Sequence, residues 1–179
     1  MPVSAANLLE PQFRPATSGD ADCLRAVRAA AFAPVFAAFR AMLGDDLYEL
    51  VQRREDEAQQ ALLDALIAGQ DGWALHVARL GTQTIGFVAL RCDPATRVGE
   101  VGLNAVDPLH ARRGIGTAMY RYALGCLRAA GMGAATVATG GDASHAPARR
   151  AYTKAGFDKA IPSVWMCCSL AGLTDRDRS

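Results

Sequence analysis

The sequence predicts a mixed α/β fold in which helices cover a central sheet. Apolar residues recur at helical spacing up to about residue 68, and they alternate with polar residues between 73 and 106. After residue 106, helical and strand patterns follow one another. With 179 residues, 51% of them apolar, the chain is large enough for one well-packed domain.

The first part of the chain is predicted to be one short strand followed by helices. A strand covers residues 13–17, and Thr17 or Ser18 caps a helix that runs to about Ala31. Pro34 is expected to break the helical pattern. Residues 47–68 form an amphipathic helix, whose charged stretch at 53–57 is interpreted as a solvated face.

The remaining chain is predicted to supply most of the sheet. The expected elements, in order, are strands 73–79, 84–92 and 98–106, helix 115–130, strand 135–139, helix 147–155 and strand 164–170. Gly131 and Gly156 are expected to end the two helices. The predicted organisation is a flexible leader at 1–12, a single domain at 13–172 and a polar tail at 173–179.

Charge and cysteine content exclude several classes of function. The net charge of +1 gives no reason to expect binding of nucleic acid or of an anionic membrane. No apolar run approaches the roughly 18 residues of a membrane span, and Met1–Pro11 lacks the features of a signal peptide, so a cytoplasmic location is expected. The five cysteines have no paired spacing and are interpreted as thiols, with no metal site.

The most informative segment is the turn that precedes helix 115–130. Gly114 and Gly116 allow a tight turn and the close approach of a ligand. The first amides of the helix have no intrahelical acceptor, and the helix dipole is positive there, so the turn predicts a phosphate site. Alone it also fits an ordinary helix start with surface arginines. It lacks the Lys-Ser/Thr of a nucleotide-binding P-loop and the third glycine of a dinucleotide fingerprint.

Three segments together resemble the GNAT superfamily of acetyltransferases. They are Arg14-Pro15-Ala16-Thr17-x-x-Asp20, Asn104-Ala105-Val106-Asp107-Pro108-x-x-Ala111-Arg112-Arg113-Gly114-Ile115-Gly116-Thr117 and His145-x-x-Ala148-x-x-x-Tyr152-x-x-x-Gly156-Phe157. They occur in the family's order over roughly residues 13–170. The resemblance implies the GNAT fold, with a central mixed sheet of six or seven strands flanked by helices, and acetyl-CoA as the cofactor.

The resemblance also implies a set of cofactor-binding residues. They are Asn104, Ala105, Val106, Arg112, Arg113, Gly114, Ile115, Gly116, Thr117, His145 and Tyr152. The chain departs from the family pattern at Ala111, where Gln or Arg is usual, and at His145, where Asn is usual. His145 is expected to contact the pantetheine arm, to move a proton or to serve only in loop packing.

Two residues are candidates for acid–base chemistry. By resemblance, Tyr152 is the acid that protonates the leaving thiolate, unless it is only a packed tyrosine. Glu100 is the candidate base, because it lies fourteen residues before Gly114, as the catalytic Glu does in some members, and an exposed strand residue is the alternative. Strict alternation would place Glu100 on the same strand face as Asn104. A backbone N–H near Ala105 or Val106 is expected to polarise the thioester carbonyl.

Candidates for acceptor binding are Phe36, Arg40, His76 and Asp142. Phe36 is alternatively a core residue, His76 a structural histidine, and Asp142 a residue that orients His145. The predicted function is transfer of an acetyl group from acetyl-CoA to a primary amine of a small molecule or peptide. The alternative is a non-catalytic acyl-CoA-binding sensor or interaction domain. A homodimer is possible.

Overall fold

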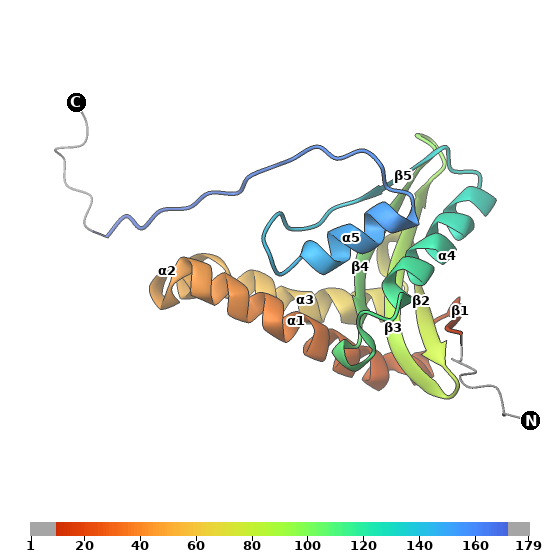
Figure 1. Cartoon of the computed structure of the whole chain (residues 1–179), viewed down its shortest axis with the longest axis horizontal. Helices are drawn as coiled ribbons and strands as arrows, with labels where there is room; N and C mark the ends of the chain where they lie inside the picture. Colours follow the sequence, from red (N-terminus) through yellow and green to blue (C-terminus); the bar gives the residue numbers. More distant parts are fainter. Residues whose placement is uncertain (1–9, 172–179) are drawn as a thin grey trace, which may run out of the picture.

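The sheet of the computed structural model, which describes residues 10–171, is built of five strands in chain order (Figure 1). The strands are β1 (Gln12–Pro15), β2 (Trp73–Leu80), β3 (Gln83–Asp93), β4 (Val98–Val106) and β5 (Ala134–Val137). β1 to β4 pair antiparallel, whereas β5 pairs parallel to β4. β5 is therefore an edge strand of the described sheet, with its second edge uncovered by any strand.

Helices cover both faces of this sheet and form a separate apolar core on each. One face carries α1 (Ala21–Leu43) and α3 (Arg53–Ile67), with the short α2 (Asp45–Val51) between them in the chain. The other face carries α4 (Ile115–Ala129) and α5 (Ala146–Ala155). The core under α1 and α3 includes Leu24, Leu63, Val77, Phe87 and Ala105. The core under α4 and α5 includes Ile85, Val88, Val101, Met119, Leu127 and Tyr152.

A bulge in β4 changes which residues face which core. Val88 pairs with Asn104 and Leu90 pairs with Val101, so two residues of β4, at 102 and 103, lie opposite the single residue Ala89. Both belong to the face of α1 and α3, where Leu103 packs and where a Cβ on Gly102 would meet the ring of Trp73. The alternation of the strand is thereby reversed beyond the bulge.

β4 and β5 pair over only half the length of β4. Their register covers Val98–Val101 of β4 and Ala134–Val137 of β5. Beyond this point β4 continues to Val106, while the chain after β5 turns into the loop 138–145 that leads to α5. The two strands therefore part next to the bulge and leave an opening between them.

Most of the predicted elements are confirmed, with differences of one or two residues at their ends. Thr17 forms a capping box with Asp20, and the Asp20 carboxylate also binds the Arg14 guanidinium at 2.7 and 2.8 Å. The predicted helix 47–68 is two helices that meet at Gln52. The predicted leader and the polar tail lie largely outside the described residues.

Three predictions about the fold are wrong. α1 does not end at Pro34 but continues to Leu43. Pro34 removes one main-chain hydrogen bond, and packing of the second half of α1 against α2 and α3 offsets this loss. Residues 164–170 form no strand, because no neighbouring strand is present to pair with them, and the described sheet has five strands, not six or seven.

By length and composition, one helical stretch, Ser18–Leu43, could cross a membrane. In the fold, the first half of this stretch packs against the sheet, and Leu24 and Val27 are buried in the core under α1 and α3. α1 is thus an apolar helix that covers a sheet face.

At Gly86, β3 lies close to the half of β4 that is not paired with β5. We therefore expect Gly86 to tolerate substitution poorly. A Cβ at Gly86 would lie 2.8 Å from the carbonyl oxygen of Ala105, and backbone of a paired strand cannot move away easily. We expect Gly86→Ala to lower the free energy of unfolding by about 1–3 kcal/mol, as overpacking does. Chemical denaturation measures this difference.

Gly125→Ala is the matched control. Gly125 lies inside α4, and a Cβ there would have no atom within 4 Å. This variant should raise the free energy of unfolding by about 0.5–1 kcal/mol, the usual gain from Ala over Gly in a helix. Equal denaturation midpoints for the two variants would contradict the assignment of Gly86.

Candidate active site

The turn before α4 has the geometry of an anion site. Gly114 is the N-cap of α4 and has a φ of 81°, and Arg112 also adopts a left-handed conformation, with a φ of 61°. Residues 111–114 are exposed, whereas Ile115 is buried and anchors the first turn of the helix. The free amides of α4 are thus presented to solvent with no side chain at Gly114 to cover them.

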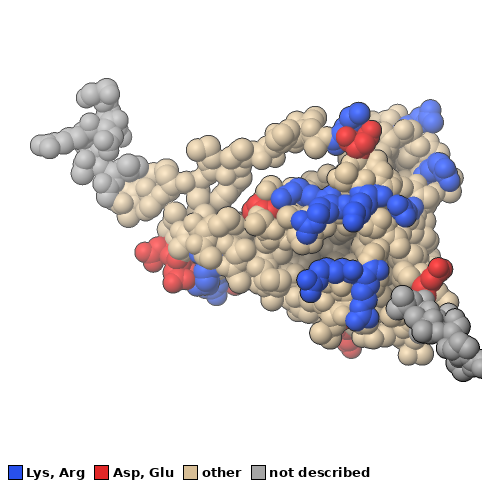
Figure 2. Space-filling model, in the orientation of Figure 1, with Lys and Arg blue, Asp and Glu red and all other residues tan. Residues whose placement is uncertain are grey.

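Basic side chains gather on the face that carries this turn. Figure 2 shows one group of Lys and Arg side chains over α5 and the adjoining part of α4, and a second group near the start of α4. A hollow lies between them. The exposed basic residues of these segments are Arg112, Arg113, Arg121, Arg150 and Lys154. A polyanionic ligand that binds the turn therefore meets positive charge on both sides.

The opening between β4 and β5 presents backbone groups to a ligand. Ala105 pairs with Phe87 and Val106 with Gly86, so both are held by β3 on one side only. In an antiparallel pair, adjacent residues alternate between facing the partner strand and facing away from it. One of Ala105 and Val106 therefore directs its N–H and C=O into the opening, as the polarising role expected for this segment requires.

Tyr152 packs beside the half of β4 that is not paired with β5, and β4 holds its hydroxyl there through Asn104. Asn104 Nδ2 donates a hydrogen bond of 3.0 Å to the Tyr152 hydroxyl, and the Tyr120 hydroxyl donates one of 2.7 Å to Asn104 Oδ1. The rings of Tyr120 and Tyr152 pack with their centroids 4.3 Å apart. These contacts fix the phenol from three elements, α4, α5 and β4.

Both tyrosines are neutral at physiological pH. Burial raises the pKa of Tyr152 above its usual value, and the hydrogen bonds from Asn104 and Tyr120 lower it only in part. Burial also raises the pKa of Tyr120 well above its usual value, and the adjacent Tyr152 adds to this effect. Tyr152 thus keeps a proton that it can donate to a group in the opening.

The loop 138–145 brings Asp142 and His145 together. His145 Nδ1 lies 2.6 Å from Asp142 Oδ1, and the backbone N–H and hydroxyl of Ser144 both bind Asp142 Oδ2. Burial would raise the pKa of Asp142, but the hydrogen bonds from Ser144 and His145 outweigh it and lower the pKa to about 2. Asp142 is therefore ionised. The ring of Phe39 in α1 stacks on the His145 imidazole.

Glu100 is not brought to this group of residues. Because the β4 bulge lies between them, Glu100 is on the face of α1 and α3, whereas Asn104 is on the face of α4 and α5. The prediction that they share a face is therefore wrong. The Glu100 carboxylate forms an ion pair of 2.5 Å with Arg91, whose guanidinium stacks on Trp73.

His76 also lies elsewhere in the molecule. It is in β2, separated from β4 by β3, and its Nδ1 forms a hydrogen bond of 2.8 Å with the Tyr122 hydroxyl. Burial lowers the pKa of His76. The structure therefore favours the alternative given for His76, a structural histidine that links β2 to α4.

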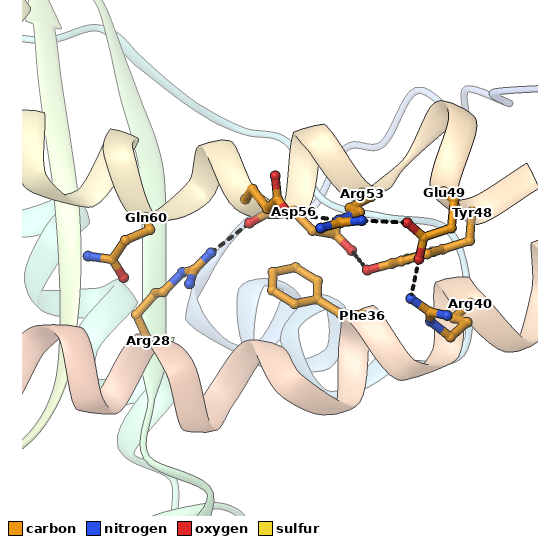
Figure 3. A pocket seen from close by; sticks show the side chains of 9 residues that line it. Arg28, Phe36, Arg40, Tyr48, Glu49, Arg53, Asp56 and Gln60 are labelled. Carbon is orange, nitrogen blue, oxygen red and sulfur yellow. Dashed lines mark hydrogen bonds and ion pairs between the residues drawn. The ribbon is translucent and has the colours of Figure 1, made fainter. Parts of the chain in front are cut away.

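Phe36 and Arg40 line a cavity of about 590 Å³ between α1, α2 and α3 (Figure 3). Arg40 forms ion pairs of 2.7 Å with Asp45 and Glu49 and lies over the Tyr48 ring. The buried Asp56 accepts hydrogen bonds from Tyr48 and Gln52. Each carboxylate that lines this cavity already has partners: Arg40 and Arg53 for Glu49, Arg53 for Glu57, and Tyr48 and Gln52 for Asp56.

Sequence reasoning missed three residues of the site: Tyr120, Gly140 and Arg149. Tyr120 belongs to a helical stripe with Gly116, Ala123 and Leu127, and this spacing could have identified it. Arg149 binds the carbonyl oxygens of Gly140 and Asp142, and nothing in its spacing indicates this contact. Within residues 10–171, no three His, Cys, Asp or Glu side chains come close enough to hold a metal ion.

Comparison with known proteins assigns this arrangement to a family. The model of the Acetyltransferase (GNAT) family matches residues 36–157, about two thirds of the chain. The chain therefore belongs to the GNAT acetyltransferase family and is an acyltransferase. A comparison with curated protein sequences finds no significant match.

Solved structures share the fold. A GNAT-family acetyltransferase from Brucella melitensis in complex with acetyl-CoA is 23% identical, with a TM-score of 0.55 over 79% of this chain and 81% of that one. A structure described as a GNAT-family acetyltransferase from Desulfovibrio desulfuricans is also 23% identical, with a TM-score of 0.61 over 82% and 83%. The aminoglycoside N-acetyltransferase AAC(6')-Iy, bound to a bisubstrate analogue, is 14% identical, with a TM-score of 0.59 over 89% and 99%.

The anion site at the start of α4 is testable by a substitution at Gly114. Gly114→Asp places a side chain and a negative charge against the free amides of the helix. We expect the Kd for CoA, measured by calorimetry, to rise at least about tenfold, which is ~1.4 kcal/mol.

Gly131→Asp provides the control at the opposite end of α4. Gly131 has a φ of 82° and equally open surroundings, so the backbone strain of the substitution is matched. This variant should bind CoA like the wild type. A Gly114→Asp variant that binds as tightly as Gly131→Asp would disprove the phosphate site.

Proposed function

We propose that the protein transfers the acetyl group of acetyl-CoA to a primary amine of a small molecule. The observation that carries this proposal is the position of the Tyr152 phenol. It is held by Asn104 at the opening between β4 and β5, next to the exposed N-terminus of α4. A phosphate site and a proton donor on one face are what direct transfer from a CoA thioester requires.

The residues present fit the donor, acetyl-CoA. The amides of residues 113–117 would bind the pyrophosphate, with charge from Arg112 and Arg113 in place of the side chain missing at Ala111. The exposed N–H of Ala105 or Val106 would polarise the thioester carbonyl from the edge of β4. Thr117 lies in the first turn of α4 and adds a hydroxyl to the same site.

Tyr152 supplies the proton of the reaction. As the amine forms its bond to the carbonyl carbon, the bond to sulfur breaks and negative charge develops on the sulfur. The phenol, neutral because of its burial, donates its proton there. Asn104 and Tyr120 hold the phenol in position and do not themselves change protonation.

A small-molecule amine is the acceptor class that we favour over a peptide. The fold is shared with the aminoglycoside N-acetyltransferase AAC(6')-Iy, which supports an amine on a small molecule. α1 lies along the opening and presents Phe39 to the loop 138–145. This contact narrows the approach to the opening from the side of α1.

The catalytic role is tested by Tyr152→Phe. If Tyr152 is the acid, the substitution should lower kcat by about 10²–10⁴-fold and change the Kd for CoA little. Thiol release from acetyl-CoA with a panel of amines measures kcat. Tyr122→Phe, which removes a hydroxyl bound to His76 away from the opening, is the control and should keep wild-type turnover.

The outcome also separates the two candidate functions. Tight binding of CoA by the wild type without thiol release on any amine would favour the alternative, a non-catalytic acyl-CoA-binding domain. Wild-type turnover in Tyr152→Phe would refute the role of the phenol while leaving the activity itself in place.

We also propose that the protein forms a homodimer through residues 161–170. This apolar segment runs away from the body after α5 (Figure 1), and Ile161 is 96%, Val164 83% and Met166 84% exposed. Each copy has one such unpaired segment and one uncovered β5 edge. In the dimer, the segment of each copy pairs as an added strand with β5 of the other copy. The two contacts are related by a two-fold axis, and each gives hydrogen-bond partners to one segment and one β5 edge.

Light scattering after gel filtration tests the dimer. The wild type should elute with about twice the chain mass of 18.9 kDa, and Trp165→Asp should shift the protein toward the monomer because it places a charge in the contact. Leu50→Asp, at an exposed position of α2, is the control and should stay dimeric. A monomeric wild type at all accessible concentrations would refute the proposal.

A further inference from the structure

Asp142 and His145 form a dyad with a defined tautomer. The Asp142 carboxylate is an acceptor only, so the 2.6 Å contact requires the proton to be on His145 Nδ1. Nε2 of the neutral imidazole then carries a lone pair, and within residues 10–171 it has no hydrogen-bond partner. This arrangement, a carboxylate on one ring nitrogen and a lone pair on the other, is that of a general base.

The loop is built around this dyad. Arg149 donates hydrogen bonds to the carbonyl oxygens of Gly140 and Asp142, which fixes the loop to the first turns of α5. A Cβ at Gly140 would lie 2.5 Å from both Asp142 Oδ1 and His145 Nδ1. Only glycine therefore leaves room for the carboxylate and the imidazole at this point.

The dyad borders the opening that holds Tyr152. The loop begins where β5 ends, and His145 is the N-cap of α5, seven residues before Tyr152. Seven residues are two helical turns, so both side chains lie on one face of α5, about 10 Å apart along its axis. The ring of Phe39, from α1, stacks on the imidazole ring.

We propose that His145 is the general base of the acetyl transfer and that Asp142 is its positioning residue. This assignment rests on the proposed function and names a second catalytic residue for it. Glu100 lies on the opposite face of the sheet from Tyr152 and its carboxylate is bound to Arg91, whereas Nε2 of His145 has no hydrogen-bond partner within residues 10–171.

The proton balance of the step is complete with these two residues. His145 Nε2 takes a proton from the amine nitrogen as the new C–N bond forms. The C–S bond breaks, and Tyr152 gives its proton to the sulfur. The imidazolium, stabilised by the Asp142 carboxylate, then loses a proton and the phenolate regains one, so both residues return to their starting forms with no further reactant.

The groups around the imidazole come from the loop, from α5 and from α1. On the loop, Asp142 and the hydroxyl of Ser144 face it. On α5, the Arg149 guanidinium binds the loop carbonyls, and Tyr152 lies two turns away. From α1 the uncharged Phe39 stacks on the ring, and the adjoining Arg40 is paired with Asp45 and Glu49.

The test compares His145→Asn, His145→Gln and Asp142→Asn with the wild type in kcat, KM, Kd for CoA and the pH profile of kcat/KM. The two His145 variants keep a polar side chain but cannot take a proton. We expect kcat to fall by about 10²–10⁴-fold, with the Kd for CoA unchanged within about threefold. The profile is measured with an amine for which the kcat/KM of the wild type falls at low pH. In the two His145 variants this fall should be absent.

Asp142→Asn separates positioning from folding. This variant keeps the shape of the loop but loses the carboxylate that orients the imidazole. It should therefore lower kcat by less than the His145 variants do, while KM and the Kd for CoA stay unchanged. His76→Gln, which changes a histidine away from the opening, should leave kcat and the profile unchanged. Thermal denaturation identifies any variant that fails to fold.

The results distinguish this assignment from the proposed function. If the wild type releases thiol and His145→Asn has the same kcat and pH profile, an amide serves as well as the imidazole. That result would overturn the role of His145 and leave the proposed function in place. A wild type that acetylates no amine would overturn the proposed function and this assignment with it.

Discussion

The parting of β4 from β5, directly beyond the bulge at residues 102 and 103, is the constraint on which the rest of the molecule depends. A regular parallel pair would bury the backbone of Ala105 and Val106 in the sheet. Here that backbone is supported by β3 alone, and it becomes part of a binding surface. Because the bulge also reverses the alternation, Asn104 faces α4 and α5, where it can hold Tyr152.

The elements that meet at this opening each supply one chemical function. α4 supplies free amides, α5 supplies the phenol, and the loop before α5 supplies the Asp142–His145 pair. None of these groups depends on a flexible side chain alone, since β4 holds the phenol and Arg149 holds the loop. Contacts within the protein position these groups without a ligand, and this limits the entropy lost when ligands are ordered there.

The sequence alone predicted the parts of the site that depend on local pattern. The glycine turn and its helix are a local signal, and they lie where residues 112–117 indicated. Glu100 was placed wrongly because a bulge inserts one residue into an alternating pattern without a mark in the sequence. The strand at 164–170 was predicted from apolar β-type residues, but a strand also needs a neighbour, and pairing is a property of the whole sheet. The contact of Phe39 with His145 joins residues 106 apart, which no spacing rule reveals.

Pro34 divides α1 into two parts with different freedom to change. Before it, Leu24 and Val27 are buried against the sheet, and the buried Arg28 binds the Asp56 carbonyl of α3. Beyond it, the helix carries Phe36 and Phe39, which face the cavity and the imidazole. Mutations in the second part can therefore alter what the protein accepts without a cost in the core. Divergence of specificity among descendants of this chain should concentrate in residues 35–43, while the buried residues before Pro34 are retained.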